Sequence, residues 1–190
     1  MSKILTASAI VAAALATSAA QAHELVFTTT LSGPNEAPPN SSAGTGFSTV
    51  TIDLDLATMR IQAQFSGLTG NASACHIHGL TALPFAGTAG VMTPTPSFPG
   101  FPHGGTFGTY DRTLDLTLAS SYNAAFVTAS GSIANAMNRL IQSLEQSRGY
   151  LNIHTTAFPG GEIRGFYVPA PGMGAMLAGA GLLAARRRRA

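Results

Sequence analysis

Three histidines have the residue type and the spacing that could hold a metal ion. His76 and His78 are two residues apart, so in a β-strand both side chains project from the same face. His154 lies in a second strand-like segment and shares a face there with Asn152. If the two segments are neighbours in a sheet, three imidazoles converge on one polar face, which is a familiar way to hold a single copper or zinc ion.

Two other interpretations of the histidines stay open. A His-x-His pair on a sheet face also occurs as partly exposed, hydrogen-bonded imidazoles that bind no metal. His23 offers a separate copper hypothesis, because cleavage of the chain before it would free an amine and a ring nitrogen that chelate copper together, as in the histidine brace of copper oxygenases. Nothing else in the sequence resembles those enzymes.

The acidic residues give weaker signals. A tight turn at 159–161 would place Glu162 and Arg164 on one face of the following strand, where we expect a surface ion pair or a lock on strand register. A ligand role for the Glu162 carboxylate is the alternative. Asp53 and Asp55 could pair for glycoside chemistry, but no apolar neighbours would raise a carboxyl pKa there, so we expect turn residues. No nucleophile elbow, phosphate-binding glycine loop or His-Glu-x-x-His motif occurs.

Period-2 alternation predicts the strands that must position these residues. Residues 55–58 read as a hairpin turn between two of the strands. Because no crossover helices separate most strands, we expect an all-β, antiparallel Greek-key β-sandwich. The expected strands are 25–31, 47–56, 59–68, 74–78, 106–118, 150–155 and 161–168.

One helix is expected within this pattern, near 132–148. Ser132 is a candidate N-cap, and Arg148 and Gly149 are candidates for its end. We expect its apolar stripe to cover an open end of the sandwich. The stripe consists of Ile133, Met137, Leu140, Ile141 and Leu144. The Pro- and Gly-rich stretch 93–105 predicts an irregular surface loop, and Cys75, the single cysteine, is expected to pack inward.

The charge distribution excludes a nucleic acid as the partner. Of the ten Lys and Arg residues, five lie at the two ends of the chain. Residues 23–168 carry five arginines and eight carboxylates, which gives this body a net charge of −3. A mildly acidic body without lysine offers no basic surface for a phosphate backbone.

The first 22 residues predict a secretory signal peptide. Lys3 precedes an apolar run at 4–16, and the small residues around Gln21 end with Ala22, which places cleavage before His23. The apolar run is too short to span a bilayer core of about 30 Å. We therefore expect the Sec translocon as the partner in export and a secreted body, residues 23–168.

The last segment, 169–190, predicts a sorting or anchor signal. Its apolar stretch, 173–185, reaches about 20 Å as a helix, so transient rather than permanent membrane insertion is expected. The arginines at 186–189 would stay on the cytoplasmic side. The arrangement resembles the PEP-CTERM sorting signal of Gram-negative bacteria, with Pro169 and Pro171 flanking Ala170 where that family has glutamate. The resemblance implies cleavage by an exosortase; an uncleaved tail anchor is the alternative.

Three segments of the body resemble the CHRD domain, named after chordin and common in exported bacterial proteins. The resemblance covers nearly the whole body and implies a β-sandwich module outside the cell. The growth-factor role of chordin does not transfer to a bacterial chain. The three segments are Leu31–Pro39, His76–Gly79 and Asn152–Gly165.

A more distant resemblance links the histidines to Cu,Zn superoxide dismutase. In that family a Gly-Leu-Thr segment precedes a His-x-His strand and a later strand supplies a further copper ligand, as 67–69, His76, His78 and His154 would here. The resemblance implies an immunoglobulin-like or superoxide dismutase-like sandwich and a bridging ligand at His103. The body has too few histidines for both metals of that enzyme, so one copper or zinc ion is the most it implies.

Two functions are therefore expected to compete. The first is a non-catalytic β-sandwich module at the bacterial cell surface or in the extracellular matrix, which binds a ligand or matrix component. The second is a mononuclear copper- or zinc-binding sandwich with redox activity, carried by the three histidines. Metal analysis of the folded body separates these two hypotheses.

Overall fold

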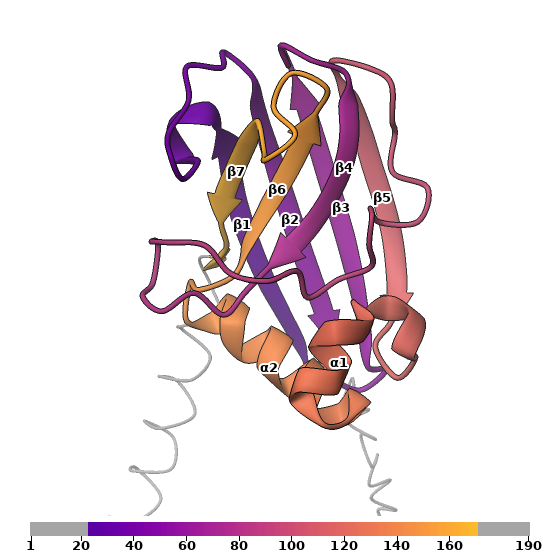
Figure 1. Cartoon of the computed structure of the whole chain (residues 1–190). Helices are drawn as coiled ribbons and strands as arrows, with labels where there is room; N and C mark the ends of the chain where they lie inside the picture. The colour runs from indigo at the N-terminus through magenta and orange to yellow at the C-terminus, as the bar shows by residue number, and fades with distance from the viewer. Residues whose placement is uncertain (1–22, 171–190) are drawn as a thin grey trace, which may run out of the picture.

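The structure is a computed structural model that describes residues 23–170 (Figure 1). The expected signal peptide with Ala22, and the tail from Pro171 onward, lie outside the described residues. None of the helices described within 23–170 combines the length and the apolar character needed to cross a bilayer. The strands are β1 (Glu24–Ser32), β2 (Thr45–Asp53), β3 (Thr58–Ser66), β4 (Ala72–His78), β5 (Gly108–Asp115), β6 (Tyr150–Thr155), β7 (Ile163–Phe166) and β8 (Val168–Pro169).

The strands form one antiparallel sheet in the order β4-β6-β7-β1-β2-β3-β5, with β8 paired to β1. The sheet curls so that its two halves lie one in front of the other, with β4, β6 and β7 facing β1, β2, β3 and β5 (Figure 1). Apolar side chains of both halves form one core, for example Phe27 and Ile61 with Ile77 and Leu151. The expected all-β, antiparallel, sandwich-like fold is thus confirmed.

The long hairpin of β2 and β3 follows the expected alternation. Buried and exposed residues alternate along β3, because one face of the strand packs on the core and the other faces solvent. The turn between β2 and β3 is held by Asp53, whose carboxylate accepts hydrogen bonds from the backbone N–H groups of Asp55 and Leu56. Both aspartates are therefore turn residues, as predicted.

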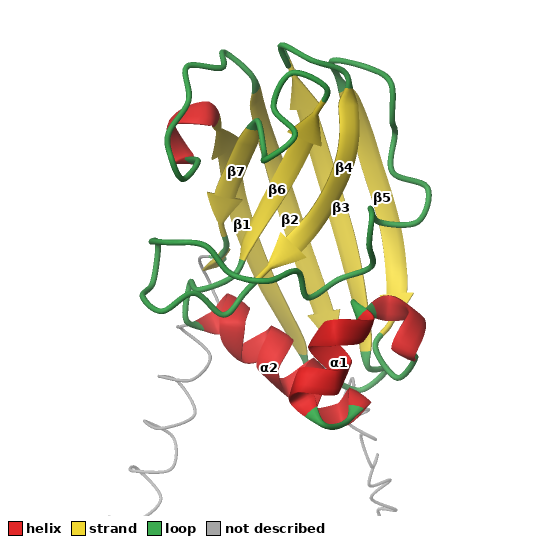
Figure 2. Cartoon of the chain, in the orientation of Figure 1, coloured by secondary structure: helices red, strands yellow, loops and turns green. Residues whose placement is uncertain are grey.

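Two helices cover one end of the curled sheet (Figure 2). Helix α2 (Ile133–Glu145) has the predicted cap at Ser132, and its Leu140 and Leu144 are fully buried in the core. The predicted end at Arg148 and Gly149 is wrong: the helix ends at Glu145, and Ser147 takes the left-handed conformation. Helix α1 (Ala124–Ser130) was not expected.

Short 3₁₀ turns and a long loop complete the described chain. The turns are η1 (Gly33–Asn35) and η2 (Ala119–Ser121). The predicted Pro- and Gly-rich loop runs along the outer edge of β4, and Phe98 and Met92 donate backbone hydrogen bonds to Cys75 and Ile77 of that strand. Side chains of Ser97 and Thr93 accept from the N–H groups of the same two residues.

Candidate metal site

The pairing of β4 with β6 brings the three histidines to one face of the sheet. His76 lies opposite Asn152, His78 opposite Tyr150, and Ala74 opposite His154. Cys75 and Ile77 project from the other face of β4 into the core, where they are buried. Strand alternation and register thus place the imidazoles together on the outer face, as the sequence predicted.

The three imidazoles lie in direct contact. Ring centroids are 4.8 Å apart for His76 and His78, 4.7 Å for His76 and His154, and 6.2 Å for His78 and His154. One nitrogen from each ring lies within 4.8 Å of the other two. Metal–nitrogen bonds of about 2.0–2.1 Å place ligand nitrogens roughly 3–4 Å apart. Movements of about an ångström therefore close the three nitrogens around one ion.

Backbone carbonyls fix the tautomer of two of the rings. Nδ1 of His78 lies 2.8 Å from the carbonyl oxygen of Ala89, and Nδ1 of His154 lies 2.9 Å from that of Pro159. A carbonyl only accepts, so each Nδ1 carries the proton and each Nε2 keeps its lone pair. Both Nε2 atoms are buried without a hydrogen-bond partner, as is Nδ1 of His76. Carbonyl contacts of this kind orient histidine ligands in metal sites.

Burial keeps the imidazoles neutral. Desolvation, followed by the neighbouring His78 and His154 rings, lowers the pKa of His76 to about 3. Desolvation also lowers the pKa of His78 and of His154, and outweighs the carbonyl hydrogen bonds that oppose it. At neutral pH all three rings are therefore uncharged, which is the protonation state that binds metal.

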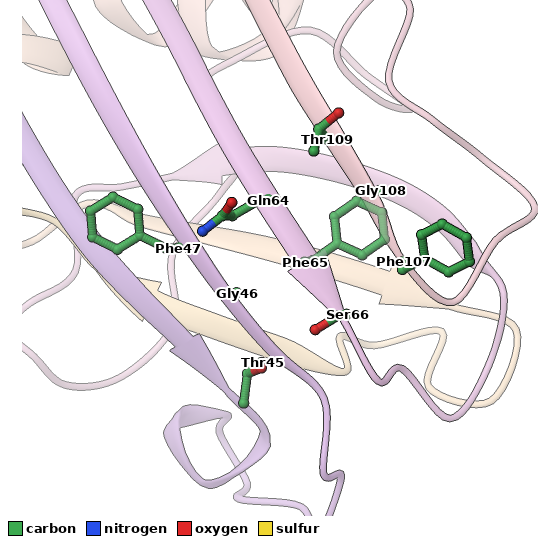
Figure 3. A pocket seen from close by; sticks show the side chains of 9 residues that line it. All are labelled: Thr45, Gly46, Phe47, Gln64, Phe65, Ser66, Phe107, Gly108 and Thr109. Atoms are coloured by element: carbon green, nitrogen blue, oxygen red, sulfur yellow. The ribbon is translucent and has the colours of Figure 1, made fainter.

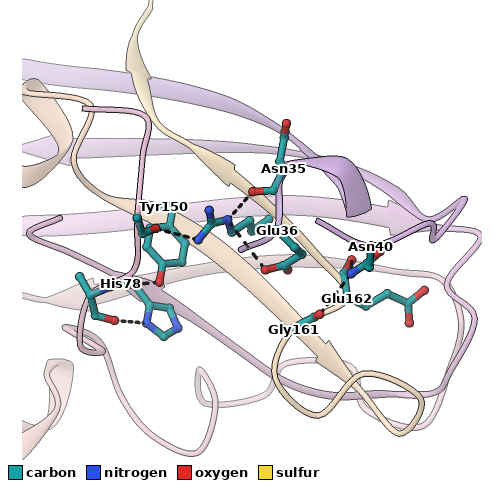
Figure 4. A network of polar contacts seen from close by, with 10 residues as sticks. Asn35, Glu36, Asn40, His78, Tyr150, Gly161 and Glu162 are labelled. Carbon is teal, nitrogen blue, oxygen red and sulfur yellow. Dashed lines mark hydrogen bonds and ion pairs between the residues drawn. The ribbon is translucent and has the colours of Figure 1, made fainter. Parts of the chain in front are cut away.

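Tyr150 and Arg164 support His78 from β6 and β7. The Tyr150 ring stacks on the His78 imidazole, and its hydroxyl accepts a hydrogen bond from the N–H of Ala89, the residue whose carbonyl holds His78 (Figure 4). The Arg164 guanidinium lies 4.8 Å above the Tyr150 ring centre. Arg164 also donates hydrogen bonds to the carbonyls of Asn35 and Gly87, which lie on two different loops. Both loops are therefore held over this face.

The expected surface ion pair between Glu162 and Arg164 is wrong. Both residues are buried, and Arg164 pairs instead with Glu36, whose Oε2 lies 3.8 Å from its Nε (Figure 4). The loop at 33–40 places Glu36 against Arg164, while Ser42 and the 69–70 backbone enclose the Glu162 carboxylate, and local strand alternation could reveal neither contact. Burial raises the pKa of Glu36 to about 7, although Arg164 opposes the rise.

Glu162 ties three distant segments together. Its carboxylate accepts hydrogen bonds from the hydroxyls of Ser42 and Thr155 and from the backbone N–H groups of Thr69 and Gly70. Burial alone would raise the pKa of Glu162, but these four donors outweigh it and lower the pKa. Glu162 is therefore a structural anion, and its lone pairs are already engaged.

The remaining site predictions have mixed outcomes. Within the described residues, His103 lies outside the histidine cluster: it is exposed and its ring contacts Phe101. His23 is exposed and contacts Asp55. Asn152 lies beside the cluster as expected. Pro169 belongs to β8 opposite Phe27, so the sheet extends past the predicted boundary at 168.

Sequence reasoning missed Glu36, Tyr150 and Ala89. Tyr150 shares the period-2 face of Asn152 and His154, so alternation alone could have placed it on the site face. Glu36 and Ala89 are on loops, and no local pattern predicts which sheet face a loop covers.

The CHRD domain family model matches residues 27–167, a range that contains most of β1, all of β2 to β7 and all three clustered histidines. No curated protein and no solved structure shows a significant match to the chain.

Proposed function

Because the chain belongs to the CHRD domain family, we propose that it is an exported domain of the bacterial cell envelope that binds one copper or zinc ion through His76, His78 and His154. CHRD domains are typical of extracellular and secreted proteins. The site supports metal binding because it presents three neutral nitrogen donors and, among the described residues, no carboxylate or thiolate in the cluster.

One observation carries the proposal. Each of the three rings has one buried nitrogen without a hydrogen-bond partner, and ligand nitrogens of the same three rings lie within 4.8 Å of one another. Leaving a buried polar atom unpaired costs about 1–3 kcal/mol, so three together are a large cost in an ordinary structural cluster. A single ion bound by all three removes that cost, whereas the metal-free interpretation leaves it in place.

Calorimetry with Cu²⁺ and Zn²⁺ tests the proposal. We expect about one equivalent of either ion, with Cu²⁺ bound more tightly, as imidazole ligands generally dictate. His78→Ala and His154→Ala should each weaken Cu²⁺ binding by at least tenfold. His103→Ala and His23→Ala are matched controls and should leave affinity within twofold. Saturable binding that survives His78→Ala and His154→Ala would assign the ion to another site.

Export is supported by the sequence at the two ends of the chain. The Sec translocon would deliver the chain, cleavage after Ala22 would free His23, and an exosortase would remove the segment that follows Pro169 and Pro171. Intact mass spectrometry of envelope material is expected to give a form that begins at His23 and lacks the arginines at 186–189. A form that retains those arginines would indicate an uncleaved tail anchor.

A second candidate function, binding of an extracellular matrix component, is supported by a hollow on the outer face of β2, β3 and β5 (Figure 3). It has a volume of about 620 Å³ and is lined by uncharged side chains, among them Gln64, Ser66 and Thr109. Phe47 and Phe107 flank it and are 41% and 73% exposed. Flat aromatic rings beside hydroxyl and amide groups suit an uncharged polysaccharide.

Retention on immobilised neutral polysaccharide tests the second candidate. Replacing both Phe47 and Phe107 by alanine should abolish retention. Phe85→Ala is the matched control, because Phe85 is 61% exposed and lies outside this hollow. Equal retention of all variants would reject this surface.

A further inference from the structure

The unpartnered polar atoms of the site extend beyond the histidines. Among the described residues, six buried side-chain nitrogen or oxygen atoms have no hydrogen-bond partner. Ser143 contributes one, on helix α2. The other five belong to the histidine cluster or its surroundings, and each is an atom able to accept a hydrogen bond: Glu36 Oε1, His76 Nδ1, His78 Nε2, Asn152 Oδ1 and His154 Nε2.

Asn152 stands between two of the ligand histidines. It lies directly across from His76 in the β4–β6 pair and two residues before His154 on the same face. Cross-strand neighbours on one face have Cβ atoms about 4.5–5.5 Å apart, so its amide is within reach of a molecule bound at the cluster. Asn152 is only 4% exposed, so bulk solvent does not satisfy its oxygen.

The Asn152 amide is also closely confined. A Cβ atom on Gly161 would lie 2.6 Å from both its Oδ1 and its Nδ2, and 2.8 Å from Oε1 of Glu36. Glycine at 161 therefore leaves room for the amide and the carboxylate. Glu36 pairs with Arg164 through its other oxygen, and Arg164 also lies across from Asn152 in the β6–β7 pair, but the Asn152 oxygen accepts no hydrogen bond from it.

The two kinds of acceptor need different partners. Ring nitrogens with free lone pairs are satisfied by a metal ion, but an amide oxygen buried beside them is best satisfied by a hydrogen-bond donor. Three histidines leave a coordination position open, and water is the usual occupant of that position when protein ligands number three. A bound water carries the O–H groups that an amide oxygen accepts.

We propose that the ion held by His76, His78 and His154 has a water molecule as its remaining ligand, and that Asn152 is the positioning residue whose amide oxygen accepts a hydrogen bond from this water. The proposal rests on the metal-binding function above. An acceptor oxygen at Asn152 makes the fourth coordination position of the ion selective. Ligands that donate a hydrogen bond are favoured there, and ligands that only accept are disfavoured.

Azide binding to the Cu²⁺-loaded protein tests this selectivity. Azide displaces water from copper and has no proton to donate, so in the wild-type protein it leaves the Asn152 oxygen unpaired. Asn152→Leu removes the oxygen and should tighten azide binding by about three- to tenfold, the worth of one hydrogen bond. The azide-to-copper charge-transfer band follows the titration. Asn152→Asp keeps an acceptor oxygen and should bind azide no more tightly than wild type.

Matched variants and outcomes separate the two proposals. Asn71→Leu makes the same substitution at an exposed position and should leave azide affinity unchanged. If Asn152→Leu does not fold, Asn152→Ala removes the same oxygen and carries the same expectation. A change below threefold, or loss of Cu²⁺ uptake in the folded Asn152 variants, overturns the role of Asn152 while wild-type copper binding still stands. Absence of Cu²⁺ binding in the wild-type protein overturns both proposals.

Discussion

The imidazole of His78 and the phenol ring of Tyr150 stack face to face, with centroids 4.8 Å apart and planes 2° from parallel. The two rings are also joined through one residue, because Ala89 donates its N–H to the Tyr150 hydroxyl and accepts from Nδ1 of His78. Tyr150 therefore holds the loop that fixes the tautomer of His78, one of the three proposed metal ligands. In this position it would act on a bound ion without touching it.

Tyr150→Phe is expected to weaken Cu²⁺ binding by about tenfold, in the range seen when groups that orient metal ligands are removed. The substitution keeps the ring stack but removes the oxygen that anchors Ala89, so His78 gains freedom to turn. Competition with a chromophoric chelator measures the change.

Tyr110→Phe is the control for that experiment, because its hydroxyl donates to the carbonyl of Pro99, which lies away from the histidines. It should leave Cu²⁺ affinity within twofold. Equal affinities for both variants would show that the hydroxyl of Tyr150 does not orient His78.

Glu162→Gln is expected to lower the free energy of unfolding by about 2–4 kcal/mol, because a charged acceptor with four donors is replaced by a group whose NH₂ faces some of them. Its pKa is lowered in the folded state, so this stability is present above the ordinary pKa of 4.5 and is lost as pH falls through the folded pKa. Urea denaturation at neutral pH measures the cost. Glu145→Gln, at an exposed position, should cost nearly nothing.

Glu36 is expected to make the protein less stable as pH rises. Its pKa rises from 4.5 to about 7 on folding, so between these values the folded state binds more protons and stability falls with increasing pH. Glu36→Gln cannot titrate, so its stability relative to wild type should improve by about 2–3 kcal/mol between pH 5 and pH 8. Urea denaturation of both proteins in the presence of a chelator measures the difference in their free energies of unfolding. Both proteins carry the same histidines, so the titration of the histidines cancels in this difference. A constant difference at the two pH values would contradict the prediction.

Leu140→Ala in helix α2 is expected to lower the free energy of unfolding by about 2–5 kcal/mol, because Leu140 is fully buried and the substitution leaves a cavity. Leu56→Ala is the matched control: Leu56 lies in the β2–β3 turn, is 70% exposed, and should change stability by less than about 0.5 kcal/mol. A small effect at Leu140 would mean that the helix covers the sheet end only loosely.

Local patterns predicted most of the strands because alternation survives wherever one face is exposed. The boundaries of β6 match the prediction, and the Asp53 turn is in place. Helix α1 was missed because seven residues are too short to show a helical period, and only Phe126 in it is buried. Its signals were the two ends: the Asn123 side chain caps the N-terminus by accepting from the N–H of Ala125, and Gly131 ends the helix in the left-handed conformation.

The candidate site, too, could be predicted only in part from the sequence. His76, His78 and His154 could be grouped from spacing, because period-2 geometry fixes which side chains share a face. Their surroundings could not be predicted: the Glu36–Arg164 pair and the Ala89 contacts depend on where two loops fold back over the sheet. Such contacts join residues far apart in the chain, and no short-range pattern encodes them.

The loop along the outer edge of β4 has a further consequence for how the domain meets other chains. A free edge strand offers unpaired N–H and C=O groups to which another polypeptide can add as an extra strand, and such addition starts aggregation. Here the backbone and side chains of the loop already occupy that edge at Cys75 and Ile77, and its prolines have no N–H with which to pair further. The opposite edge, β5, carries Asp111, Arg112 and Asp115, and charges on an edge strand oppose the addition of a further strand. The strand that holds two of the three clustered histidines is thereby shielded from edge-to-edge association.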